Sequence, residues 1–124
     1  MRAGVERCGD ILFSIECIKQ HLATPAVRGF ASFMQKEWDA ASYRMLIIGE
    51  TAKNLIAHHR QSIEQVSTQT YDLLANLREV ARMRDRLIHH FWATKHDVVF
   101  LTIQDDLPKL KDYIHRLEAV LALS

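Results

Sequence analysis

The sequence contains few of the residues that end helices or cross-link chains. Its 124 residues include four glycines, two prolines and two cysteines. Such a scarcity of turn residues excludes a hairpin-rich β protein, and the apolar residues recur at helical spacing throughout. Cys8 and Cys17 lie on one predicted helix and do not resemble a disulfide framework, which suits a reducing cytosol. We therefore expect an all-α, cytoplasmic protein.

Several other features are missing, and each excludes a class of function. The net charge is only +1, so the chain is no polycation, and any RNA site must be a local concentration of arginine. No apolar run could span a bilayer, and the N-terminal residues lack the apolar segment of a signal peptide. No glycine-rich phosphate loop is present. A zinc site from His89, His90 and His96 lacks a fourth ligand at suitable spacing.

The composition is that of an ordinary soluble globular protein, with 48% hydrophobic and 25% charged residues. Its length suits one domain over residues 1–124, folded as an antiparallel bundle of four to five helices. The apolar spacing predicts helices over residues 6–22, 27–35, 39–58, from 71 or 72 to 92, and from 95–97 onward with a restart at Pro108. We interpret residues 58–70 as a helix end and a loop, with His58 and His59 at the surface.

The predicted helix around residue 84 has an arginine in the middle of its apolar face. On a helical wheel, one arc collects Leu73, Leu77, Val80, Ala81, Leu87, Ile88 and Phe91. Arg84 falls within that arc, where an unpaired guanidinium would be costly to bury. Either a carboxylate pairs with Arg84, or the arc lines a cleft or subunit seam that an anion can enter. Glu50 is the first candidate partner, and a purely structural ion pair or a solvated Glu50 are the alternatives.

Two further features accompany Arg84. Asp85 and His89 are four residues apart, so that Asp85 can hydrogen-bond the imidazole and fix its tautomer. A basic stripe at i+4 spacing follows the edge of the same helix and consists of Arg78, Arg82 and Arg86. This stripe is either a solvated helix face or a contact for an RNA backbone. Gly49, in the middle of a predicted helix, indicates close approach of a neighbouring backbone.

Three segments together resemble the HepT-like branch of the HEPN superfamily. Residues 83–91, Met-Arg-Asp-Arg-Leu-Ile-His-His-Phe, are similar to its motif of Arg, a polar Asn or Asp, three residues, His, any residue and usually Tyr. Residues 41–53 resemble the family helix built around Ile-Gly-Glu-Ala. Residues 97–100 and 106–110 resemble its closing segment. The similarity runs from about residue 10 to residue 113.

The resemblance implies a homodimeric endoribonuclease that needs no metal and no cofactor, the toxin of a prokaryotic pair with a minimal nucleotidyltransferase antitoxin. It implies catalytic roles for Arg84, His89 and Asp85 in a dimer cleft, where a ribose 2′-OH attacks the phosphodiester. Supporting or RNA-binding roles would fall to Arg78, Arg82, Arg86, Phe91 and Glu50. The family's tyrosine resembles an acceptor for nucleotide transfer by the antitoxin, whereas Phe91 has no hydroxyl and can still stack on a base or the other subunit. The toxin could then be neutralised by binding alone or by modification elsewhere, or the chain could be a weak or inactive relative.

Two other readings compete with a nuclease. The chain could be a non-catalytic subunit that binds a nucleotide or docks a nucleotidyltransferase. It could also be a purely structural dimerisation domain, in which Glu50 fully occupies Arg84 and shields it from any ligand.

Overall fold

A computed structural model describes residues 2–22, 35–67, 72–94 and 96–123 of the protein. These residues form six α-helices and one short 3-10 helix: α1 (Arg2–Leu22), α2 (Gln35–His58), α3 (Arg60–Ser67), α4 (Asp72–His89), η2 (Phe91–Ala93), α5 (His96–Asp105) and α6 (Leu107–Ala122). The all-α prediction is confirmed. The predicted helix over residues 27–35 falls almost wholly outside the described residues. α1 and α2 begin about one turn earlier than expected, and α4 ends at His89 rather than at residue 92.

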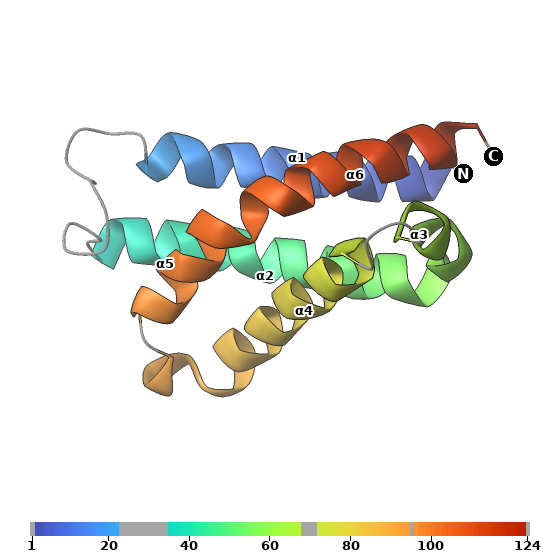
Figure 1. The fold of residues 1–124 in the computed structure, drawn as a ribbon. Coiled ribbons are helices and arrows are strands. Elements are labelled where there is room, and N and C mark those ends of the chain that lie inside the picture. Colours follow the sequence, from blue (N-terminus) through green and yellow to red (C-terminus); the bar gives the residue numbers. More distant parts are fainter. Residues whose placement is uncertain (1, 23–34, 68–71, 95, 124) are drawn as a thin grey trace.

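The helices pack as a bundle in which α2 lies between α1 and α4, and α6 lies along α1 (Figure 1). The apolar stripe predicted for α1 forms part of the core, where Cys8, Ile11 and Ile18 have at most 1% of their surface exposed. Both ends of the described chain lie at the same end of the bundle (Figure 1). Across the described ranges, no helix is both long and apolar enough to pass through a bilayer.

The α3 helix corrects the expectation of a loop between residues 58 and 70, and it raises the helix number above the four to five expected. Ile63, at the centre of α3, is fully buried. Its amide donates to the carbonyl of His59 at 3.0 Å, and the amide of His59 donates to that of Leu55 at 2.8 Å. His59 is therefore buried, not at the surface as predicted, while His58 is exposed. A helix of two turns shows too few apolar residues for a period to be recognised.

The last two helices follow the prediction closely. α5 ends at Asp105, and α6 begins at Leu107 with Pro108 in its first turn. The apolar residues that recur at helical spacing along α6 are buried: Leu107, Leu110, Ile114, Leu117 and Leu121. Asp106 occupies the N-cap position, but its backbone is helical and its side chain makes no capping hydrogen bond. The fixed φ of proline in the first turn therefore marks this helix start better than a side-chain cap does.

Candidate functional site

The face that α4 presents to the core matches most of the predicted arc. Leu73, Leu77, Val80, Ala81 and Leu87 are buried, and so is Met83, which lies outside the predicted arc. Ile88 is 47% exposed, so its assignment to the core is wrong. It lies one turn beyond Arg84, about 40° away around the helix, at the edge of a hollow between α2 and α4. An apolar side chain is thus exposed beside the arginine.

Gly49 brings the α2 backbone against α4 at the height of Arg84. A Cβ atom at position 49 would overlap Cβ of Arg84 and lie 2.7 Å from the carbonyl oxygen of Val80. The backbone approach expected from this mid-helix glycine is confirmed. Because the next residue on α2 is Glu50, this close packing also brings a carboxylate to the guanidinium of α4.

Arg84 is held by two carboxylates. Its Nη2 lies 2.9 Å from Oε2 of Glu50, the partner predicted from the sequence, and its Nη1 donates to Oδ1 of Asp85 at 2.9 Å. The arginine side chain is 23% exposed and the Glu50 side chain 55%. Glu50 therefore pairs with Arg84 but neither occupies the whole guanidinium nor shields it from solvent.

Lys53 is a member of this cluster that the sequence patterns did not identify. Its Nζ donates to the same Oδ1 of Asp85 at 2.9 Å, from α2 across to α4. The hydrogen bond from Lys53, followed by the one from Arg84, lowers the pKa of the Asp85 carboxyl below its ordinary value. Lys53 follows Glu50 by three residues, so both lie on one side of α2. The spacing in the sequence could therefore have drawn attention to Lys53, but it could not show that Lys53 faces Asp85.

His89 is exposed at the last position of α4. No hydrogen bond joins Asp85 to His89 among the described residues, and Oδ1 of Asp85 accepts from Lys53 and Arg84. Five positions separate His89 from Arg84, which places them about 140° apart around the helix and about 7.5 Å apart along its axis. Within one chain, the guanidinium and the imidazole therefore point from different faces of α4.

Phe91 lies against the core rather than free at the surface. Its ring centroid is 5.8 Å from that of Trp38, and the two ring planes are inclined by 42°. Trp38 is only 2% exposed. The turn after α4 is fastened by Thr94, whose Oγ1 donates to the carbonyl of His90 at 2.7 Å. Packing against Trp38 gives the apolar ring at position 91 a structural role.

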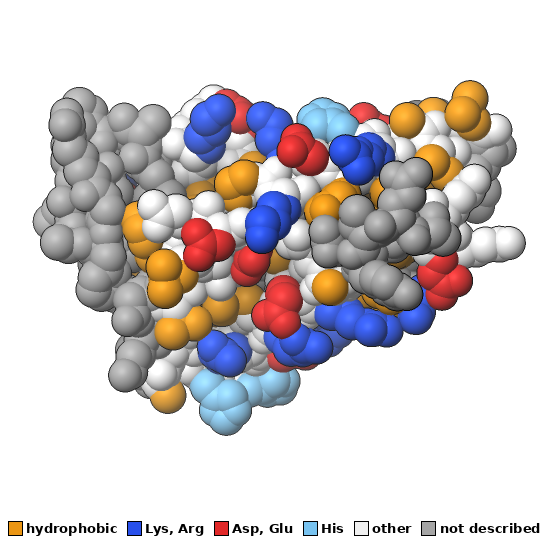
Figure 2. All heavy atoms as spheres, in the orientation of Figure 1, with side chains coloured by type: hydrophobic (Ala, Val, Ile, Leu, Met, Phe, Trp, Pro, Cys, Tyr) orange, Lys and Arg blue, Asp and Glu red, His pale blue; other side chains and the backbone are white. Residues whose placement is uncertain are grey.

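The basic stripe is present on the surface of α4. Arg78, Arg82 and Arg86 are all exposed, as the i+4 spacing predicts, and Arg82 forms an ion pair with Glu79. Lys and Arg side chains gather over α4 on the face seen in Figure 2, with histidines beyond them. The stripe places three exposed arginines on one face of α4, where Glu79 offsets part of their charge.

The hollow beside Arg84 is shallow and has an apolar rim. It encloses about 290 Å³, and its lining comprises Leu46, Ile47, Glu50, Thr51, Arg84 and Ile88. No group of three or more His, Cys, Asp or Glu side chains suited to a metal occurs in the described part of the chain, and the side chain of His96 lies outside it.

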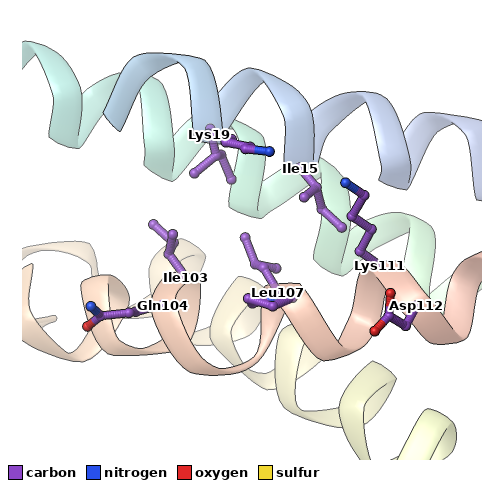
Figure 3. A pocket seen from close by; sticks show the side chains of 9 residues that line it. Ile15, Lys19, Ile103, Gln104, Leu107, Lys111 and Asp112 are labelled. Atoms are coloured by element: carbon purple, nitrogen blue, oxygen red, sulfur yellow. The ribbon is translucent and has the colours of Figure 1, made fainter. Parts of the chain in front are cut away.

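A larger pocket of about 640 Å³ lies elsewhere, between α1 and the α5–α6 junction. Figure 3 shows its apolar residues, such as Ile15, Ile103 and Leu107, with Lys19 and Lys111 nearby. None of the residues predicted for the site lines it. This pocket and the candidate site are therefore different places.

Comparison with known proteins places these residues in a family. The family model described as "Ribonuclease HepT-like" matches residues 11–117. A "Probable ribonuclease HepT" of Thermococcus cleftensis is 30% identical over 109 residues, which cover 87% of this chain and 89% of that protein. A protein of Methanocaldococcus jannaschii, described as a gamma-glutamylcyclotransferase and candidate RNase, is 31% identical over 106 residues, or 84% of this chain and 42% of that protein. No solved structure gave a significant match.

Proposed function

This chain belongs to the HepT-like ribonuclease family, and we propose that it is the endoribonuclease toxin of a prokaryotic toxin–antitoxin pair, with a site built from Arg84 and His89. The observation that carries the proposal is the position of Arg84. Its guanidinium is largely covered, is paired on two sides, and still opens onto a hollow at the protein surface. A guanidinium held in a fixed orientation at a surface suits the binding of a phosphodiester.

The site we propose is completed by a second copy of the chain. Arg84 and His89 leave α4 about 140° apart, so a single chain does not bring them to one face. Around Arg84, Ile88 is 47% exposed and the rim residues Leu46 and Ile47 are partly so. A twofold contact through these apolar residues would bury them and bring both copies of Arg84, Asp85 and His89 to one cleft.

In that cleft the reaction needs two proton transfers and one anion site. One His89 takes the proton from the ribose 2′-OH, and the oxygen attacks the neighbouring phosphorus to form a P–O2′ bond. The P–O5′ bond breaks as an imidazolium, either the one just formed or that of the second His89, gives a proton to the leaving oxygen. Arg84 stabilises the charge that develops on the non-bridging oxygens. The products are a 2′,3′-cyclic phosphate and a 5′-hydroxyl, and no metal takes part.

The proposed partner is a minimal nucleotidyltransferase antitoxin. Position 91 carries a phenylalanine, which has no hydroxyl to accept a nucleotide and whose ring packs on Trp38. We therefore propose that the antitoxin neutralises this chain by binding to it, with no modification at residue 91. The exposed stripe of Arg78, Arg82 and Arg86 would then hold the RNA backbone on either side of the cleft.

The test is incubation of the purified protein with single-stranded RNA, followed by analysis of the fragment ends. We expect fragments that end in a 2′,3′-cyclic phosphate and begin with a 5′-hydroxyl. Arg84→Ala and His89→Ala should each abolish cleavage and leave the circular dichroism spectrum unchanged. His90→Ala is the matched control, because it removes the neighbouring exposed imidazole and should cleave normally. Unchanged cleavage by both Arg84→Ala and His89→Ala would refute the site.

A second function is favoured by the charges around Arg84. Two cations, Arg84 and Lys53, are paired with two anions, Glu50 and Asp85, so the cluster carries no net charge. A neutral cluster, whose cations are already paired, suits a non-catalytic subunit that docks the nucleotidyltransferase. That function predicts partner binding without RNA cleavage, with Arg84→Ala affecting affinity alone.

A further inference from the structure

One carboxylate oxygen holds two cations from different helices. Oδ1 of Asp85 accepts a hydrogen bond from Nη1 of Arg84 on α4 and another from Nζ of Lys53 on α2, each at 2.9 Å. The two nitrogen atoms therefore lie no further apart than twice that distance. The Lys53 and Asp85 side chains are each 44% exposed, so this part of the cluster faces solvent.

Both cations keep donors for a ligand. An ammonium has three N–H groups, and Asp85 uses one of those on Lys53. A guanidinium has five, and Glu50 and Asp85 approach its two terminal nitrogens. A phosphodiester presents two non-bridging oxygens and one negative charge. Two cations at this spacing can each donate to one of those oxygens, an arrangement that neither can complete alone.

We propose that Lys53 is a second phosphate-binding residue beside Arg84, and that Asp85 is a positioning residue that holds the two cations at a fixed spacing. This inference rests on the proposed RNA-cleaving function and adds two roles to it. Lys53 binds the substrate directly. Asp85 acts through Lys53 and Arg84, and not through the imidazole of His89. The carboxylate is suited to this role because the pKa of Asp85 is lowered by the same two cations, which keeps it charged.

The role of Lys53 is tested by binding of a short single-stranded RNA with 2′-O-methyl groups, which cannot undergo attack by its own 2′-oxygen. We expect Lys53→Gln to weaken binding on the order of tenfold, as removal of a charged hydrogen bond does. The slope of log affinity against log salt should become shallower by about 0.7, because one fewer phosphate is neutralised by the protein. Lys53→Arg should retain most of the affinity. Lys36→Gln removes an exposed lysine of the same helix, about 25 Å away, and should bind as the unmodified protein does.

The Asp85→Asn variant distinguishes two roles of Lys53. Lys53 could contact the phosphate directly, or it could only neutralise the charge of Asp85. If Lys53 binds phosphate, Lys53→Gln weakens RNA binding in the Asp85→Asn background as well. If Lys53 only balances the charge of Asp85, its effect disappears once residue 85 is an amide, and the proposal for Lys53 is overturned.

The role of Asp85 is read from kcat on cleavable RNA. Asp85→Ala should lower kcat, whereas Asp85→Asn, whose Oδ1 still accepts hydrogen bonds, should keep most of it. Equal kcat in all three proteins would overturn the positioning role. Cleavage by the unmodified protein, measured beside these assays, distinguishes failure of this inference from failure of the proposed function. If it cuts RNA and Lys53→Gln binds normally, only the inference about Lys53 is overturned. If it neither binds nor cuts RNA, both proposals fall.

Discussion

Replacement of Gly49 by alanine should destabilise the protein, although alanine is the better helix former. In an exposed helix, this exchange is favourable by about 1 kcal/mol. At position 49 the added Cβ would overlap Cβ of Arg84 and lie 2.7 Å from the carbonyl oxygen of Val80. Neither atom can move away by rotation of a flexible side chain, so α2 and α4 would have to separate.

The expected magnitude follows from these two opposing effects. Overpacking of a tight contact costs about 1–3 kcal/mol, and the upper part of that range applies because backbone atoms are involved. After the gain in helix propensity, Gly49→Ala should lower the free energy of unfolding by roughly 1–2 kcal/mol. Gly9→Ala on α1 is the matched control, because no atom lies within 4 Å of its added Cβ. It should raise the free energy of unfolding by up to about 1 kcal/mol.

Urea unfolding followed by circular dichroism, at one protein concentration for all variants, measures both changes. We expect opposite signs for the two glycines. Gly49→Ala should also reduce RNA cleavage, because separation of α2 from α4 moves Lys53 away from Asp85 and Arg84. If Gly49→Ala were as stable as Gly9→Ala, the close packing of α2 on α4 that aligns the cluster would be refuted.

Three further predictions concern Glu50, Thr94 and His59. Glu50→Gln should change the free energy of unfolding by less than about 1 kcal/mol, because the pair is partly exposed. It should tighten RNA binding, because Arg84 is freed of a competing anion, and weaker binding in a titration would contradict that competition. Thr94→Val removes the 2.7 Å hydrogen bond to the His90 carbonyl and should cost about 1 kcal/mol in urea unfolding; an unchanged midpoint would rule out this fastening. Burial, then the positive charge of nearby groups, lowers the pKa of His59 below 6.5. As the pH falls, His59 is therefore protonated in the unfolded chain before it is protonated in the folded chain. The free energy of unfolding should fall as the pH drops below 6.5. In His59→Gln, the free energy of unfolding should depend less on pH, as measured by urea unfolding above and below pH 6.5. An equal dependence in both proteins would show that His59 is not its cause.

The long helices and the heart of the cluster could be predicted because each leaves a local pattern. The α6 stripe repeats over four turns, so its period is evident, and Pro108 marks its start. Arg84 is conspicuous because it interrupts an apolar arc. Gly49 is conspicuous because glycine is a poor helix former, and Glu50 because it follows Ile47, Ile48 and that glycine.

The features that the sequence did not predict depend on contacts between helices. Lys53 resembles any solvated lysine until Asp85 is seen opposite it. A helical wheel places His89 next to Asp85, four residues along the same helix. It cannot show that Lys53 of another helix and the adjacent Arg84 donate to the Asp85 carboxylate. Ile88 has the right phase for the core, yet no described helix covers it. Tertiary placement, and not local propensity, decides each of these.

Mixing of two inactive variants tests the shared site most directly. Arg84→Ala and His89→Ala proteins should each fail to cut RNA. When the two are mixed and allowed to exchange subunits, we expect partial recovery of cleavage, because mixed dimers hold one intact Arg84 and one intact His89 in the same cleft. A mixture that stays inactive, beside an unmodified protein that cleaves, would contradict a site shared between two copies of the chain.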